Sequence, residues 1–286
     1  MNTSLAGWLN GFLGMLIFSA SLPATRAAVQ DFDPVFLTVA RASLAGLMGC
    51  LLLAAWRVKR PSREDAPSLL IVAFGVVVGF PLLTALALRH ITAAHSIVFI
   101  ALLPLATALF GVLRAGERPQ RAFWIFAASG SAVVVGFALS NDASASLIGD
   151  SFMLAAIIVC GLGYAEGAKL SRKLGGWQVI CWALVFSLPL MLVGSLFLKP
   201  DSFSQVGAPA WLGLAYVSMF SMLIGFIFWY RGLAQGGIAA VGQLQLLQPF
   251  FGLMLAAVVL KEAISAAMIV TSILVVLCVM GARWMS

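Results

Sequence analysis

The chain has 286 residues, of which 62% are hydrophobic and only 9% are charged, and its mean hydropathy is +1.07. Soluble domains carry about 25% charged residues, so this composition excludes a protein whose surface faces water throughout. The formal net charge is +7, yet the basic residues gather in particular loops, which indicates membrane topology rather than a nucleic-acid partner.

Apolar runs of about 20 residues, the length that crosses the hydrocarbon core as a helix, follow one another along the chain. They predict ten transmembrane helices, called spans one to ten, near residues 5–25, 34–56, 68–88, 92–113, 122–140, 150–172, 176–198, 209–230, 238–260 and 263–282. The runs are continuous, whereas a β-barrel needs shorter segments of alternating polarity. The first run lacks the basic n-region of a cleaved signal peptide. We therefore expect an all-α integral membrane protein.

Twelve of the seventeen basic residues follow the even-numbered spans. They are Arg57, Lys59, Arg60, Arg63, Arg114, Arg118, Arg121, Lys169, Arg172, Lys173, Arg231 and Arg283. The loops on the other side hold only Arg26, Arg89, Lys199 and Lys261. Because cytoplasmic loops are enriched in Lys and Arg, this asymmetry predicts that both termini lie in the cytoplasm.

The two halves of the chain contain a matching pattern. Pro104 in span four stands thirteen residues before Glu117, and Pro249 in span nine stands thirteen residues before Glu262. An alanine pair opens both spans. Chance similarity between apolar helices is the alternative to an internal repeat, and the equal spacing argues against it.

Each half would hold five spans, and after an odd number of crossings the second copy enters the membrane upside down. The sequence therefore predicts ten transmembrane helices arranged as two inverted five-helix repeats, at residues 1–140 and 141–286. Inverted repeats are typical of secondary transporters, in which the substrate site lies between the repeats near the membrane midplane.

Three segments carry a resemblance to known proteins: AAHSIVFIALLPLATALFGVLRAGERP, IAAVGQLQLLQPFFGLMLAAVVLKE, and FLTVARASLAG around Arg41. They resemble the drug/metabolite transporter superfamily with paired EamA-type domains, over nearly the whole chain. The resemblance implies a ten-helix exporter of amino acids and other small metabolites in the bacterial inner membrane. Two positions depart from the family pattern. Phe18 stands where span one often carries Trp, and Leu184 stands where an arginine would match Arg41 in the second half.

Polar and aromatic side chains inside the spans are the candidate substrate-binding residues. His95 and Phe99 share one stripe of span four. Either this stripe faces a cavity, or His95 is simply hydrogen-bonded at the end of the helix. Ser21 belongs to a polar stripe of span one, for which a substrate path and helix packing are both open. Gln245 and Gln248 line a cavity or bond to other helices. The predicted substrate-binding residues are Ser21, Phe80, Thr84, His95, Phe99, Tyr164, Gln245 and Gln248.

Four further residues are predicted to have gating or structural roles. Pro104 and Pro249 each remove a backbone donor in mid-membrane, and we expect these kinks in moving helices that line the site. Arg41 lies about 10 Å deep in span two, where it either holds a substrate carboxylate or snorkels outward and braces the bundle. Glu166, near the inner end of span six, either carries a coupling proton or pairs with Lys169.

These patterns favour a secondary transporter that exports small amphiphilic metabolites, with amino acids first among them, by alternating access. A drug, nucleoside or phosphorylated-metabolite exchanger of the same fold is the alternative. An intramembrane enzyme would need metal ligands or acid/base pairs at depth, whereas His90 and His95 both lie near one surface. A channel would need a filter of repeated carbonyl or charged groups. We therefore expect no catalytic residue, metal or cofactor, and a monomer in the lipid bilayer, with oligomers left open.

Overall fold

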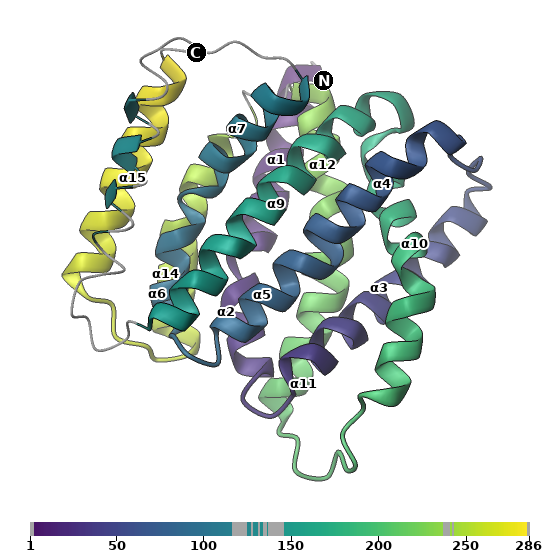
Figure 1. Ribbon diagram of the computed structural model, residues 1–286, viewed down its shortest axis with the longest axis horizontal. Helices are drawn as coiled ribbons and strands as arrows, with labels where there is room; N and C mark the ends of the chain where they lie inside the picture. Colours follow the sequence, from purple (N-terminus) through teal and green to yellow (C-terminus); the bar gives the residue numbers. More distant parts are fainter. Residues whose placement is uncertain are drawn as a thin grey trace.

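The computed structural model describes residues 3–115, 125, 126, 128–130, 132, 133, 136, 146–236, 241 and 243–284. Throughout these residues the regular elements are helices and no strand occurs, so the predicted all-α class is confirmed (Figure 1). Most of predicted span five, Glu117 and the first residues of span nine lie outside the described residues.

The described elements follow one another in chain order. The first half contains α1 (Thr3–Ser19), α2 (Ser21–Ala28), α3 (Pro34–Ala55), η1 (Arg63–Asp65), α4 (Ala66–Val72), η2 (Ala73–Gly79), α5 (Phe80–Ala87), α6 (Ala93–Ile100) and α7 (Leu103–Ala115). The second half contains α9 (Leu147–Leu174), α10 (Gly176–Phe197), α11 (Ala208–Ala215), η3 (Tyr216–Ile224), α12 (Gly225–Gly236), η4 (Gln243–Leu247), α14 (Gln248–Val259) and α15 (Ala266–Trp284).

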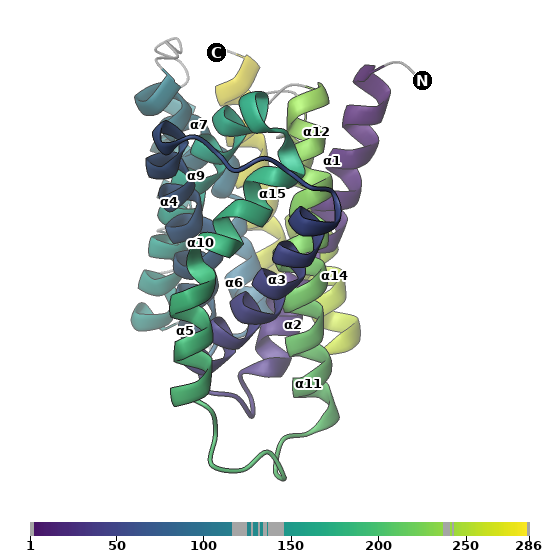
Figure 2. The same ribbon diagram turned by 90° about the vertical axis from the view of Figure 1, so that its right-hand side faces the viewer.

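Seven helical stretches in the described part of the chain are long and apolar enough to cross a membrane. They are Leu5–Ala28, Pro34–Ala55, Arg63–Ala87, Ala93–Arg114, Leu147–Leu174, Gly176–Phe197 and Ala208–Gln235. Two shorter apolar helices, Leu244–Val259 and Ala266–Cys278, stand at the predicted spans nine and ten. The first helix begins and the last helix ends at the same end of the bundle (Figures 1 and 2). We call this end the terminal end, and the other, where α10 connects to α11, the far end.

Local sequence signals set some of these boundaries. The Asp33 side chain caps α3 by accepting hydrogen bonds from the amides of Val35 and Phe36, at 2.8 and 3.1 Å. Pro34 follows as the first helical residue, where a missing N–H costs nothing. Gly175 alone joins α9 to α10, with a φ of 93°, a left-handed conformation that favours glycine.

Predicted spans one, four and nine are not continuous helices. Span one breaks at Ala20 between α1 and α2, span four breaks between α6 and α7, and in span nine the 3-10 turn η4 precedes α14. Pro104 and Pro249 are each the second residue of the helix that follows the break. Proline is tolerated there because the first amides of a helix have no intrahelical partner. Instead of kinking a continuous helix, both prolines therefore start a new one.

Spans three and eight each contain a π-helical segment in the middle. These segments are η2, which starts at Ala73, and η3, which starts at Tyr216, 143 residues later. That offset is close to the 145 residues between Pro104 and Pro249. Single π-helical turns are rare in proteins as a whole, and those that occur are often found at functional sites. Their equal placement supports the internal repeat.

The packing partners also follow the repeat. The helix α1 packs mainly on α12, α9 packs on α4, η2 and α5, and α3 packs on α10 (Figures 1 and 2). If the two halves are exchanged, span one against span eight becomes span six against span three, and span two against span seven maps onto itself. Exchange of this kind is what a two-fold relation between the halves requires.

Glycines allow the closest of these helix contacts. A Cβ added to Gly14 would lie 2.9 Å from the backbone nitrogen of Trp229, and one added to Gly75 would lie 2.6 Å from the carbonyl oxygen of Val159. The first contact joins α1 to α12 and the second joins η2 to α9. Small residues at helix interfaces are the common device for close packing in membranes.

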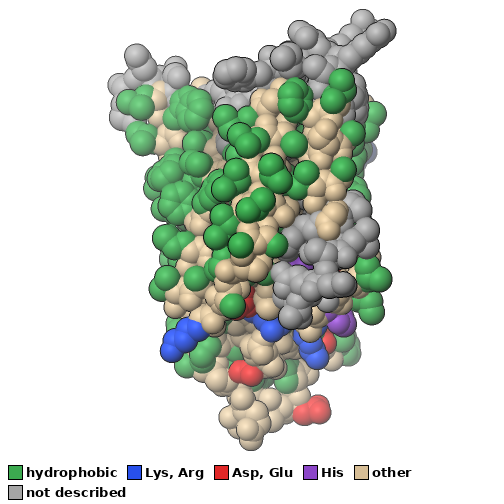
Figure 3. Space-filling model, turned by 90° about the vertical axis from the view of Figure 1, so that its left-hand side faces the viewer, with side chains coloured by type: hydrophobic (Ala, Val, Ile, Leu, Met, Phe, Trp, Pro, Cys, Tyr) green, Lys and Arg blue, Asp and Glu red, His purple; other side chains and the backbone are tan. Residues whose placement is uncertain are grey.

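The outer surface of the bundle is apolar. Figure 3 shows hydrophobic side chains over much of the flank that carries α15, with the coloured charged side chains gathered toward the far end. Large apolar side chains are widely exposed, including Phe197 at 84% and Val258 and Leu190 at 72% each. Such a surface is suited to lipid and would be unfavourable in water.

Candidate functional site

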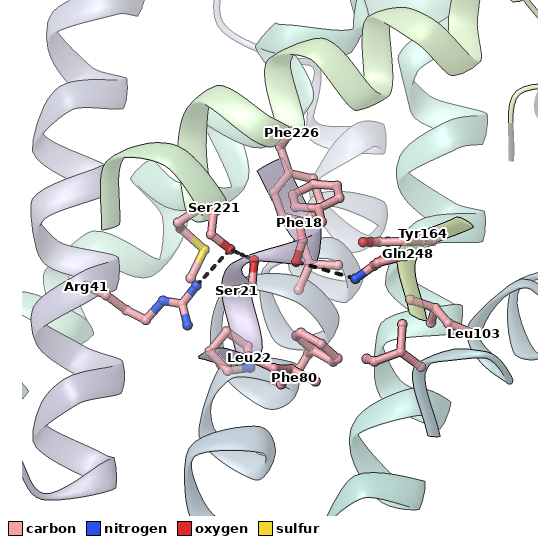
Figure 4. A pocket seen from close by; sticks show the side chains of 14 residues that line it. Phe18, Ser21, Leu22, Arg41, Phe80, Leu103, Tyr164, Ser221, Phe226 and Gln248 are labelled. Atoms are coloured by element: carbon pink, nitrogen blue, oxygen red, sulfur yellow. Dashed lines mark hydrogen bonds between the residues drawn. The ribbon is translucent and has the colours of Figure 1, made fainter. Parts of the chain in front are cut away.

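A cavity lies between the two halves of the chain, where the interrupted helices meet (Figure 4). Its walls are formed by Phe18, Ser21, Leu22, Arg41, Val76, Phe80, Pro81, Ile100, Leu103, Tyr164, Ser221, Met222, Phe226 and Gln248. The volume that the centres of water molecules can occupy is about 20 Å³, enough for one or two water molecules. This conformation must therefore widen before a metabolite can enter.

One side of the cavity is polar and is built around Arg41. The Arg41 guanidinium crosses from α3 to η3, where Nη2 donates to the Val217 carbonyl oxygen at 3.1 Å and to the Ser221 hydroxyl at 3.4 Å. Ser21 donates to the same Ser221 hydroxyl at 2.8 Å. Arg41 is 5% exposed, and its Nε has no hydrogen-bond partner among the described residues. The cation therefore points into the bundle with an N–H left to offer.

Across the cavity, Gln248 presents an acceptor. Its Nε2 donates to the Phe18 carbonyl oxygen at 3.4 Å, and its Oε1 is buried with no partner in the described part of the chain. Gln248 is the first residue of α14, and Phe18 lies at the end of α1, beside the break at Ala20. The interruption of the two helices is what brings these polar groups to the cavity wall.

Aromatic rings form the apolar part of the wall. The rings of Phe18 and Phe226 meet edge to face with centroids 4.9 Å apart, and Tyr164 meets Phe226 in the same way at 5.9 Å. Phe80 faces the cavity from the start of α5 (Figure 4). The cavity therefore combines a cation, hydroxyl groups and an amide oxygen with an aromatic surface.

Four of the eight predicted substrate-binding residues line the cavity, and Arg41 lines it as well. Those four are Ser21, Phe80, Tyr164 and Gln248, whereas Thr84, His95, Phe99 and Gln245 are buried outside the lining.

The residues outside the lining have other contacts. The Thr84 hydroxyl donates to the carbonyl oxygen of Phe80 in its own helix, at 2.8 Å. His95 Nε2 lies 2.8 Å from an Asp150 oxygen, and the His95 ring centroid lies 5.8 Å from that of Phe99. In this conformation, the stripe of His95 and Phe99 packs between helices.

Nine lining residues stand outside the sequence prediction: Phe18, Leu22, Val76, Pro81, Ile100, Leu103, Ser221, Met222 and Phe226. Ser221 had a signal in the sequence, because it and Ser218 are hydroxyl side chains in the otherwise apolar span eight. The apolar Met222 and Phe226 had none, since nothing distinguishes them from the lipid-facing side chains of the same span.

Glu166 and the predicted hinge prolines lie outside the cavity lining. Glu166 is fully buried toward the terminal end, and the predicted pairing with Lys169 is present at 3.5 Å. It also accepts from Arg114 Nε at 3.0 Å and from the Ser68 hydroxyl at 2.6 Å. Glu166 thus joins α4, α7 and α9 at this end of the bundle.

At the far end, Glu262 ties span nine to span four. Its carboxylate accepts hydrogen bonds from the amides of Ala93 and Ala94, at 3.1 and 2.8 Å, and so caps the first turn of α6. Arg26 Nε lies 4.0 Å from the same carboxylate, and its guanidinium also donates to the Leu88 carbonyl oxygen. A carboxylate at a helix N-terminus is favoured by the free amides and the helix dipole.

Comparison with known proteins agrees with this architecture. The chain is 67% identical over 283 residues to the uncharacterized transporter YdeK of Bacillus subtilis (strain 168), with 99% of each chain covered. It is 24% identical over 271 residues to a protein of Streptantibioticus cattleyicolor named a probable terminal-alkyne amino-acid exporter, covering 92% of this chain and 88% of the relative.

A solved crystal structure shares the fold, with a TM-score of 0.69 at 21% identity, over 99% of this chain and 97% of the other. The model of the EamA-like transporter family matches twice in tandem, at residues 5–139 and 147–284. The two matches agree with the predicted ten-helix fold of two repeats. The chain belongs to the EamA-like transporter family.

Proposed function

We propose that the protein is a secondary transporter that exports small amphiphilic metabolites, with amino acids as the leading class, by alternating access through the cavity around Arg41. One observation carries the proposal: a buried guanidinium with an unpartnered N–H lines a cavity between two halves of a transporter fold. A buried cation without a counter-charge is costly, and a carboxylate cargo would supply one.

The other groups of the wall complement the rest of an amino acid. Arg41 and the hydroxyl of Ser221 suit a carboxylate, because charge-assisted hydrogen bonds to a guanidinium are strong and directional. The free Oε1 of Gln248 suits the ammonium group, which has donors only. The rings of Phe18 and Phe226 suit an apolar or aromatic side chain. We therefore favour neutral amino acids with large apolar side chains.

Alternating access would use the interrupted helices. The breaks between α1 and α2, between α6 and α7, and before α14 all lie beside the cavity. Polar ties cross the bundle at both ends, through Glu262 at the far end and Glu166 at the terminal end. Opening one end would require release of its tie while the other end stays closed, as in rocking of inverted repeats.

The proposed orientation follows from charge. Because basic loops favour the cytoplasmic side, the terminal end would face the cytoplasm of a bacterial cell and the far end the outside of the inner membrane. A relative with 24% identity is named a probable exporter of an amino acid, which supports export as the direction. Phosphorylated metabolites rank lower, because Arg41 is the one charged residue among the described cavity-lining residues and a phosphate group calls for more.

Counterflow in proteoliposomes tests the proposal. Vesicles loaded with unlabelled phenylalanine or leucine should take up the labelled amino acid transiently and saturably, and empty vesicles should not. Phenethylamine, which lacks the carboxylate, and phenylpropionate, which lacks the ammonium group, should compete poorly. Counterflow of sugar phosphates but of no amino acid would instead favour an exchanger of phosphorylated metabolites. Failure of both classes with folded protein would overturn the transport site proposed here.

A further inference from the structure

A second polar pair is buried near the far end, apart from the cavity. His95 Nε2 on α6 lies 2.8 Å from Asp150 Oδ1 on α9. His95 is 0% exposed and Asp150 is 3% exposed. The second oxygen, Asp150 Oδ2, is buried and has no hydrogen-bond partner within the described ranges. We propose that His95 and Asp150 form a proton-binding site that couples export of the cargo to entry of a proton, an inference that rests on the function proposed above.

The partner of Asp150 differs from the partners of the other shielded carboxylates. Glu166 lies beside Arg114 and Lys169, and Asp65 lies beside Lys173 at 2.7 Å. Glu262 lies beside Arg26, as described above. A carboxylate beside Arg or Lys keeps its charge, because those cations remain protonated at physiological pH. Within 4 Å of Asp150 the described ion-pair partner is a histidine, and histidine exchanges its proton in the physiological range.

The pair therefore has two accessible charge states. With a neutral imidazole and an ionised carboxylate its net charge is −1, and the buried Oδ2 atom is left without a donor. After one proton binds, the net charge is zero and the burial cost of the anion is removed. In the proposed cycle the proton binds from the outer solution, crosses while cargo-free, and leaves to the cytoplasm when the next cargo molecule binds. One proton enters for each cargo molecule that leaves.

Among the described residues, the other ionisable groups that face this pair are engaged elsewhere or lie farther toward the surface. On α2 there is Arg26, and after α14 there is Glu262, which pair with each other across the start of α6. His90, in the turn between α5 and α6, stacks on Phe152 with ring centroids 6.4 Å apart, and Arg89 precedes it. The helix α15, which also packs on α6, carries no charged residue between residues 266 and 281.

The pair is connected to the cavity through both of its helices. Five residues after His95, Ile100 lines the cavity, and α6 ends there; Tyr164 lines it fourteen residues after Asp150. Beyond the break, α7 is fixed on α9, because a Cβ at Gly161 would lie 2.9 Å from the carbonyl carbon of Ala106. In the proposed cycle, the short helix α6 tilts relative to α9 when the charge between them changes.

The test compares two transport modes in the same proteoliposomes. Counterflow at equal pH needs no net proton movement and reports the cargo site alone. An acid-inside gradient of one pH unit should drive accumulation of the labelled amino acid by up to about tenfold at one proton per cargo, and a protonophore with potassium and valinomycin should abolish it. Asp150→Asn and His95→Gln should retain counterflow and lose gradient-driven accumulation, whereas Asp150→Glu should keep part of it.

The outcomes separate the two proposals. Absence of counterflow in the wild-type protein would overturn the proposed function. Normal counterflow without a response to the gradient, or an equal response in wild type and Asp150→Asn, would overturn the proton site. If the variants do not fold, the gradient response of the wild-type protein still tests proton coupling, and chemical labelling of Asp150 still tests the site. Dicyclohexylcarbodiimide, which attacks protonated carboxyls in apolar surroundings, should label Asp150 less at alkaline than at acidic pH. No labelling of Asp150 at either pH, or equal labelling at both, would contradict the proposal.

Discussion

Arg41 Nη2 reaches a carbonyl oxygen and a hydroxyl group of η3, while its Nε stays without a partner among the described residues. The side chain is therefore held in place by neutral groups that do not compensate its charge. Neutral acceptors orient a guanidinium, and only an anion offsets the cost of burying it. This arrangement is suited to a residue whose counter-charge arrives with the cargo.

Substitution of Arg41 should act on cargo affinity more than on folding. In Arg41→Gln the carboxylate loses a charge-assisted hydrogen bond, so the half-saturating amino acid concentration in counterflow should rise about 10- to 100-fold. Arg41→Lys should fall between, because the charge remains and the planar fork is lost. Ser218→Ala is the control, since the Ser218 hydroxyl donates to Leu214 of its own helix at 2.6 Å. An unchanged half-saturation in Arg41→Gln would contradict the carboxylate site.

At the scale of single residues, the sequence predicted candidate site residues but not whether their side chains face the cavity. Ser21 and Gln248 reach the cavity because each begins a helix beside a break. His95 and Phe99 belong to a stripe that would continue down span four if the helix were continuous. Because α6 ends at Ile100, that stripe stops short of the cavity. Helical periodicity predicts which residues lie on the same face of a helix. The position of a helix break decides which part of the protein that face contacts.

At the scale of elements, α6 is short and is held at its start by a residue from the other half of the chain. Glu262 accepts from the first two amides of α6, and Arg26 lies beside the same carboxylate. Since α6 ends at a break, these contacts and its packing define its position. The far end is thus closed by groups that can separate without breaking a helix.

Removal of the Glu262 charge should loosen the first turn of α6. In Glu262→Gln the amides of Ala93 and Ala94 should exchange hydrogen about three- to tenfold faster, the equivalent of about 1 kcal/mol of capping and dipole stabilisation. Hydrogen exchange read by mass spectrometry measures this. Glu64→Gln, at an exposed position of η1 near the terminal end, is the matched control. Equal exchange in wild type and Glu262→Gln would mean that packing alone holds α6.

Two helical glycines should respond oppositely to alanine. A Cβ at Gly75 would lie 2.6 Å from the Val159 carbonyl oxygen, so Gly75→Ala forces η2 away from α9 and should cost about 1–3 kcal/mol. At Gly49 the nearest atom would be 3.5 Å away, so Gly49→Ala should be neutral or raise stability by helix propensity. The melting temperature in detergent distinguishes them. A lower value for Gly49→Ala than for Gly75→Ala would contradict the packing.

The sequence predicted most of the elements and little of their irregularity. Apolar length placed the spans, and Pro104 and Pro249 marked two of the three interrupted helices. The break at Ala20 had no such marker at the break itself. The π-helical segments η2 and η3 also lack one, because an extra residue in a turn depends on the packing of neighbouring helices rather than on composition.

At the scale of the whole molecule, equal spacing of proline and glutamate predicted the repeat, and the exchange of packing partners between the halves agrees with it. The spacing did not predict the conformation. A cavity with room for one or two water molecules, between ties at both ends, would be one state of the proposed transport cycle. One sequence encodes all conformations of a protein, and which of them is most populated depends on small differences in packing free energy.

The proposed cycle assigns the far end to the outer solution, and site-directed labelling tests this orientation directly. In a background without Cys50, Cys160, Cys181 and Cys278, Ser204→Cys places a thiol in the exposed connection at the far end, and Glu64→Cys places one at the terminal end. If the basic loops are cytoplasmic, a membrane-impermeant maleimide should label Ser204→Cys in intact cells and Glu64→Cys only after permeabilisation. The reverse pattern would invert the molecule. The end that carries His95 and Asp150 would then face the cytoplasm, although the direction of antiport would still follow the proton gradient.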